Sequence, residues 1–142
     1  MASPDAKSIP DRLYIDEQDR TLYDQLKNED IFKGRNNPNL FLTAMSYGFY
    51  NRVNDKLNKR LEYVRAEYIN NDAEAMIYAL ALHHFQGDIN LLLDVEKVFN
   101  IAEQYAHAGI KLLSDLTVSK PQGSIYKHLE RMIYDVHGKL FK

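Results

Sequence analysis

Basic and aromatic residues alternate between positions 47 and 68, and this pattern is the one in the chain best suited to binding a charged partner. Tyr63 and Tyr68 flank Arg65, and Tyr50 stands just before Arg52. Lys and Arg attract phosphate groups while aromatic rings stack on bases, so the pattern suits a nucleic-acid contact. The candidate contact residues are Lys33, Arg35, Arg52, Lys56, Lys59, Arg60 and Arg65.

Charge is sorted into blocks along the sequence. Residues 33–66 carry those seven bases against Asp55 and Glu62, a net charge of +5, and residues 120–142 carry +3. Residues 1–32 and 67–119 carry −4 and −6, so the −2 of the whole chain hides two basic segments. This asymmetry favours an acidic partner such as nucleic acid. The ordinary alternative, in which the tyrosine rings are buried and the bases form a solvated helix face, stays open.

Other chemistry finds little support in the sequence. The chain has no cysteine, and its five histidines lack the spacing of a helical metal site, since His83 and His84 are adjacent. It contains no phosphate-binding glycine loop and no nucleophile elbow. We therefore expect no metal, no cofactor and a binding or accessory protein more than an enzyme. An enzyme would need a deep pocket in which a histidine and a carboxylate converge.

Helix signals cover most of the chain. Leu13 to Ile15 suggests a short extended piece, and Asp16 is expected to cap a helix after it. Asn37-Pro38 predicts a helix reaching about Tyr50. Three further helices are predicted over 51–71, over 73–86 and from Asp94 onward; the first of these is predicted from the spacing of Val53, Leu57, Leu61, Val64 and Tyr68. A last helix is predicted after a cap at Ser124. Its apolar stripe comprises Ile125, Leu129, Met132, Ile133, Val136 and Leu140.

The longest predicted helix carries an apolar seam with a repeat of about 3.5 residues. Gly109 lies within the seam, where glycine is unfavourable unless a neighbouring helix approaches closely. Such a seam is buried either by its own chain or by a second copy. Its members are Val98, Ala102, Tyr105, Gly109, Leu112 and Leu116.

The 142 residues are most simply explained as one all-α domain over residues 13–142, a bundle of five to six helices, preceded by a flexible leader over residues 1–12. No apolar run is long enough to span a membrane, and residues 1–10 lack the apolar stretch of a signal peptide. We therefore expect a cytoplasmic protein that does not enter a membrane.

Two apolar blocks also resemble a small uncharacterised prokaryotic helical family. The first block comprises Ile31-Phe32, Asn37-Pro38, Leu40-Phe41-Leu42, Ala44 and Tyr47-Gly48-Phe49, and the second runs from Val98 to Ile110. Some members of that family accompany DNA phosphorothioation (Dnd-type) gene islands. The resemblance implies an accessory to DNA modification or restriction, and it supplies no catalytic residues.

Together these patterns predict a non-enzymatic binding or accessory protein that associates with nucleic acid through its basic, tyrosine-containing segment. The alternative is a protein–protein interaction module that self-associates through the seam of its long helix.

Overall fold

The computed structural model describes residues 12–141, with the side chain of Gln122 left out of the description. Within these residues the chain is mostly helical, with five α-helices and one small sheet of two strands. The expected leader lies outside the described residues except for Arg12, which begins the first strand. The elements are β1 (Arg12–Asp16), η1 (Glu17–Asp19), α1 (Arg20–Lys27), η2 (Asp30–Phe32), α2 (Asn37–Tyr50), β2 (Arg60–Arg65), η3 (Ala66–Tyr68), α3 (Asn71–His84), η4 (Ile89–Leu93), α4 (Val95–Ser119) and α5 (Gln122–Leu140).

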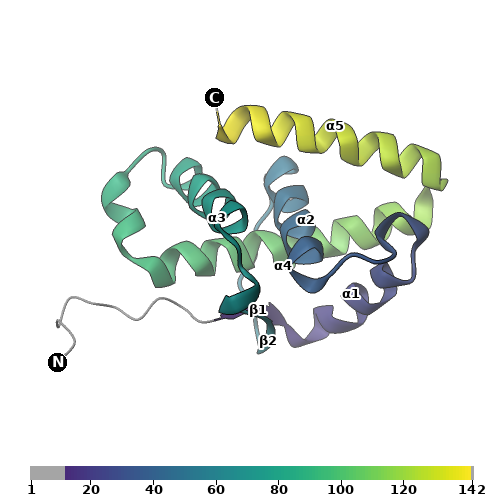
Figure 1. Cartoon of the computed structure of the whole chain (residues 1–142), viewed down its shortest axis with the longest axis horizontal. Helices are drawn as coiled ribbons and strands as arrows, with labels where there is room; N and C mark the ends of the chain where they lie inside the picture. Colours follow the sequence, from purple (N-terminus) through teal and green to yellow (C-terminus); the bar gives the residue numbers. More distant parts are fainter. Residues whose placement is uncertain (1–11, 142) are drawn as a thin grey trace.

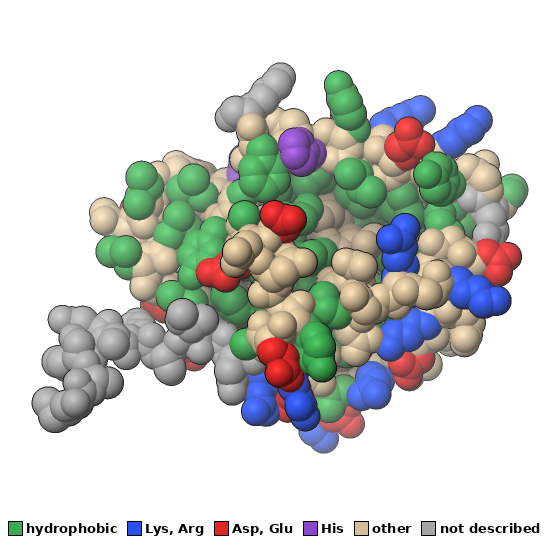
Figure 2. Space-filling view, viewed as in Figure 1, with side chains coloured by type: hydrophobic (Ala, Val, Ile, Leu, Met, Phe, Trp, Pro, Cys, Tyr) green, Lys and Arg blue, Asp and Glu red, His purple; other side chains and the backbone are tan. Residues whose placement is uncertain are grey.

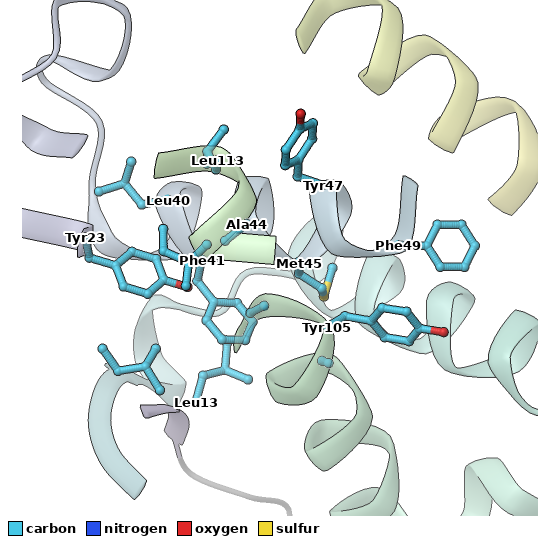
Figure 3. Packing of buried hydrophobic residues seen from close by; sticks show 14 of the residues in the cluster. Leu13, Tyr23, Leu40, Phe41, Ala44, Met45, Tyr47, Phe49, Tyr105 and Leu113 are labelled. Atoms are coloured by element: carbon cyan, nitrogen blue, oxygen red, sulfur yellow. The ribbon is translucent and has the colours of Figure 1, made fainter. Parts of the chain in front are cut away.

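Helix α4 runs through the length of the molecule, and the other elements pack around it (Figure 1). Helix α2 crosses it near the middle, α1 and α3 lie toward its two ends, and α5 covers α2 from the opposite side. Figure 3 shows the resulting cluster, in which Leu40, Phe41, Ala44 and Met45 of α2 lie among Leu13, Tyr23, Tyr105 and Leu113 from β1, α1 and α4.

The contact between α2 and α4 depends on two glycines. A Cβ atom on Gly109 would lie 1.9 Å from the carbonyl oxygen of Ala44, and one on Gly48 would lie 2.1 Å from the carbonyl oxygen of Tyr105. Each glycine therefore allows the other helix's backbone to approach closely, as predicted for Gly109. Of the seam residues, Val98, Ala102, Tyr105, Gly109 and Leu116 are buried and Leu112 is half-buried, so the seam belongs to the chain's own core.

The predicted helix over 51–71 is wrong. Helix α2 ends where Arg52 adopts a left-handed conformation with φ of 57°, and the N–H of Val53 closes the turn on the carbonyl of Gly48 at 2.9 Å. Residues 60–65 then form β2, which pairs antiparallel with β1. Tyr63 and Val64 favour a strand where a partner exists, and β1, fifty residues earlier, provides it. The expectation of an all-α fold fails only at this sheet.

Three helix starts illustrate how local capping decides the boundaries. Helix α4 begins directly after Asp94, where the sequence predicted its start, and Asp94 caps it by accepting the N–H of Lys97 at 3.2 Å. The cap of α2 is Asn36 rather than Asn37, with the N–H of Asn39 at 3.0 Å. The predicted Ser124 cap is wrong, since α5 already begins at Gln122, directly after Pro121.

Candidate functional site

Three of the seven predicted contact residues are paired with carboxylates of their own chain. Lys59 Nζ lies 3.1 Å from Glu17 Oε2, and an Arg60 guanidinium nitrogen lies 2.9 Å from Glu103 Oε1. Arg65 lies 3.7 Å from Glu62. Much of the positive charge in this block is therefore neutralised locally.

The other four bases, Lys33, Arg35, Arg52 and Lys56, are exposed and form no ion pair with another described residue. They occupy two places. Lys33 and Arg35 follow η2, whereas Arg52 and Lys56 lie in the irregular segment after α2, which is fixed to α4 by the Asp55 N–H on the carbonyl of Gln104 at 3.1 Å.

The tyrosines of the interleaved segment do not form one open surface. Tyr47 and Tyr63 are buried and Tyr50 is half-buried, so the alternative of buried rings holds for these positions. Tyr68, in η3, is 63% exposed. The pairing of aromatic rings with bases that the sequence suggested is thus mostly absent from this surface.

A polar network that the sequence did not predict lies inside the molecule, where η1 meets α4. His107 Nδ1 is 2.5 Å from Asp19 Oδ2, and these side chains are only 3% and 1% exposed. Lys111 Nζ lies 3.5 Å from Nε2 of His107. Nε2 of His107 also lies 3.9 Å from Asp16 Oδ2, so this imidazole stands between two buried carboxylates. Burial raises the pKa of Asp19, although the hydrogen bond from His107 opposes the shift.

Asp16 connects this network to the segment before β2. Its carboxylate accepts the N–H of Gln18 at 3.0 Å, the N–H of Asn58 at 2.6 Å and the N–H of Lys59 at 3.4 Å. Burial alone would raise the pKa of Asp16, but these backbone hydrogen bonds outweigh it and lower the pKa below its usual value.

Glu103, on α4, holds both strands of the sheet. It accepts the backbone N–H of Tyr14 at 2.9 Å and the guanidinium of Arg60 at 2.9 Å. Arg60 in turn lies over the ring of Tyr14, 4.2 Å from its centre. Burial raises the pKa of Glu103 to about 7, against the lowering effect of these two partners. Arg60 is therefore a structural residue of this network.

This network stabilises the fold and offers no access for a substrate. Its carboxylates and imidazole are closed off from solvent, and the groove described next is lined by other residues. The sequence carried one signal that could have revealed the network: Glu103, His107 and Lys111 recur every four residues and therefore lie on one side of the predicted long helix. Asp19 gave no such signal, because an acid in the first turn of a helix is ordinary.

A groove of about 480 Å³ lies between α2 and α5 and is mostly apolar. Its walls include Leu42 from α2, Met76 from α3 and Leu129 and Met132 from α5. Arg35 and Glu130 also line it. Outside the lining of the groove, the Tyr47 hydroxyl lies 3.1 Å from Nε2 of His128 and joins α2 to α5.

Helix α5 carries two apolar stripes instead of the single one predicted. Ile125, Leu129, Met132 and Val136 are buried against the core. Ile133, which the sequence assigned to this buried stripe, is 59% exposed. It belongs to a second, outer stripe with Tyr126, Tyr134 and Phe141, which are 62%, 82% and 48% exposed. We call these four residues the outer stripe of α5; Tyr126 and Ile133 also line the groove.

Figure 2 shows apolar side chains and histidine along the upper edge of the molecule, over α5, with Lys, Arg and acidic side chains beside them toward the right end of that edge and further Lys and Arg side chains on the right and lower parts of the same face. The outer stripe therefore forms a candidate interaction surface at one edge of the fold.

Comparisons with known proteins add no identification: no family model, no curated protein and no solved structure matches this chain. From residue 12 to residue 141, no helix combines the length and hydropathy needed to cross a membrane. The same part of the chain contains no cluster of three or more His, Asp or Glu side chains able to hold a metal ion.

Proposed function

We propose that this protein is a non-enzymatic binding module that recognises an apolar helical segment of a protein through α5. The observation that carries the proposal is the outer stripe of α5, three large exposed side chains on the helix with Phe141 directly after its end, continuous with an apolar groove. Covering such side chains contributes about 25 cal/mol per Å² of apolar surface. Contiguous exposed apolar surface of this kind marks interaction sites.

The geometry favours a helical ligand. The groove lies between α2 and α5, its lining is mostly apolar, and an amphipathic helix can place its apolar face into a groove between helices. Arg35 and Glu130 provide opposite charges at the lining, which can orient the polar edge of the ligand. The rest of the binding energy would come from Tyr126, Ile133 and Tyr134, of types that often dominate interfaces.

A binding titration tests this proposal. The full chain, labelled and kept at nanomolar concentration, is titrated with a designed amphipathic helical peptide carrying one leucine stripe, and with a scrambled peptide of the same composition. We expect only the amphipathic peptide to bind. Ile133→Glu should weaken binding about tenfold or more, because it places a charge within the apolar surface.

The matched control is Leu93→Glu, which changes an exposed leucine on η4 and should leave the affinity unchanged. Equal binding of the amphipathic and scrambled peptides, or equal affinity of the Ile133→Glu variant and the original chain, would contradict the proposal.

Nucleic-acid binding is the second candidate, supported by the four exposed bases without an ion pair to another described residue, Lys33, Arg35, Arg52 and Lys56. The resemblance to the family that accompanies DNA phosphorothioation islands suggests an accessory role in DNA modification for this candidate. Duplex binding through these bases should weaken steeply with salt.

The second candidate is tested by duplex DNA binding at low salt. Arg52→Glu combined with Lys56→Glu should weaken the affinity and reduce its salt dependence. A variant with the same change in net charge elsewhere, Lys97→Glu with Lys139→Glu, should bind more strongly than the first. No binding at low salt, or equal affinities of the two variants, would rule this candidate out.

A further inference from the structure

We infer that the partner of the outer stripe of α5 is a second copy of this chain, with the two α5 helices side by side and antiparallel. This inference rests on the proposed function and names the partner for the same surface. Tyr126, Ile133 and Tyr134, together with Glu130 and His137, occupy an arc of about 100° along most of α5, and Phe141 follows directly after the last residue of the helix. One continuous helical face is therefore available to another helix.

The order of residues along this face is self-complementary. When two copies of α5 run antiparallel and meet at a point between Ile133 and Tyr134, each stripe residue faces another stripe residue. Ile133 faces Tyr134 of the second copy, and Tyr126 faces Phe141 of the second copy. Every apolar member thus finds an apolar partner, as a two-fold symmetric interface requires.

The polar residues on the same face favour the antiparallel direction. Glu130 then faces His137 of the second copy, so a carboxylate meets an imidazole that can donate a hydrogen bond to it on each side of the two-fold axis. A parallel pair would instead place Glu130 against Glu130 and Lys127 against Lys127. Antiparallel helices also place opposite ends of their dipoles together. Both effects favour the antiparallel arrangement.

The position of α5 permits this pairing. The helix forms one edge of the described structure, and its outer side faces away from α2 and α4 (Figure 1). The buried stripe and the hydrogen bond between Tyr47 and His128 hold the opposite side. Two copies can therefore approach without a change in the fold of either one.

The size of the surface predicts a reversible dimer. Aromatic side chains bury up to about 200 Å² each, so the outer stripe offers roughly 450 Å² of apolar side chain per copy. With the stems of the polar residues beside it, the contact reaches the lower end of specific interfaces. We expect a dissociation constant on the order of micromolar.

Sedimentation velocity of the full chain, from micromolar to near-millimolar concentration, tests this inference. We expect a concentration-dependent dimer that is lost in Ile133→Glu and Tyr134→Glu. Leu93→Glu should dimerise like the original chain. Thermal unfolding of each variant confirms that the fold is kept, since all three positions are exposed. A monomer at every concentration would overturn the inference.

A charge exchange tests the direction of the helices. Glu130→Lys alone and His137→Glu alone should each weaken the dimer about tenfold, because each occurs twice in a symmetric interface. The double variant should restore the affinity to within about threefold. Failure of the double variant to recover would overturn the antiparallel arrangement.

The peptide titration separates this inference from the proposed function. A chain that stays monomeric but binds the amphipathic peptide would overturn self-pairing and leave the binding module in place. A chain that stays monomeric and binds no peptide would overturn both.

Discussion

Helices α4 and α5 are both long and amphipathic, yet they treat their apolar residues in opposite ways. In α4 the seam is buried by contacts with α2 and with elements at both of its ends. In α5 one apolar stripe is buried and a second, with Tyr126, Ile133 and Tyr134, faces outward. The difference lies in how many elements of the chain surround each helix, since α4 passes through the core and α5 lies at an edge.

This difference shows that helical periodicity identifies an apolar face without identifying what covers it. The seam of α4 has the repeat of a self-associating helix but is covered by its own chain. The outer stripe of α5 has no such cover within the described residues. Of the two helices, α5 is therefore the one with a surface available to a partner.

The largest expected effect concerns the close contact of α4. Gly109→Leu should destabilise the protein by about 4 kcal/mol or more, because even a Cβ atom would overlap the backbone of Ala44 and Gly48. Urea unfolding followed by circular dichroism measures this change. A loss below about 1 kcal/mol would show that the two helices can separate at little cost.

The next effect concerns the buried network. Asp19→Ala should cost roughly 3 kcal/mol, because it leaves His107 without its buried partner. Asp24→Ala is the control, since the ion pair of Asp24 with Arg20 is exposed and should contribute less than about 1 kcal/mol. Equal losses in the two variants, again measured by urea unfolding, would contradict the assigned role of the network.

A smaller, pH-dependent effect follows from Glu103. Its pKa is about 7 in the folded protein against 4.5 in the unfolded reference, so the folded state binds the proton more tightly. The corresponding stability is fully present below about pH 4.5 and is lost as the pH rises to about 7, a change of roughly 3 kcal/mol at most. Glu103→Gln should reduce this slope while keeping an acceptor for the N–H of Tyr14.

Unfolding free energies at pH 5 and pH 7.5 measure the slope in both proteins. Asp19, whose pKa is also raised, contributes in the same direction, so some slope should remain. Asp16 contributes in the opposite direction at lower pH, because its lowered pKa gives stability that is lost as the pH falls below about 4. Identical slopes in the two proteins would contradict the role given to Glu103.

The smallest effect sharpens the comparison between the two helices. Gly138 lies within α5, and a Cβ atom there would meet nothing within 4 Å. Gly138→Ala should therefore stabilise the protein by about 0.5–1 kcal/mol through helix propensity, the opposite sign to Gly109. Destabilisation in this variant would mean that α5 is packed more closely than described.

The parts of the fold that depend on local chemistry followed from the sequence. The helix after Asn37-Pro38, the helix start near Asp94 and the close approach at Gly109 each depend on residues near in sequence or on the known cost of glycine. The strand at 60–65 did not, because its spacing of apolar residues also fits a helix and its partner strand is distant in sequence.

The candidate site was less predictable than the fold. Asp19 and His107 are eighty-eight residues apart, and only tertiary packing brings them together. The sequence also placed Ile133 on the buried face of α5, where the structure exposes it. Ile133 is turned by about 100° from Met132 on the helix, and whether the buried face is wide enough to include both depends on the elements packed beside α5. The role of the basic residues as nucleic-acid contacts stays a prediction.

The central claim, that the outer stripe of α5 pairs with itself in an antiparallel direction, is tested most directly by disulfide cross-linking. The natural chain has no cysteine, so every thiol can be placed by design. The variant with both Glu130→Cys and His137→Cys brings two thiols together in the antiparallel pair, whereas each single variant does not. We predict a covalent dimer on mild oxidation of the double variant only. Cross-linking of the single variants to the same extent, or of none of the three, would contradict the account.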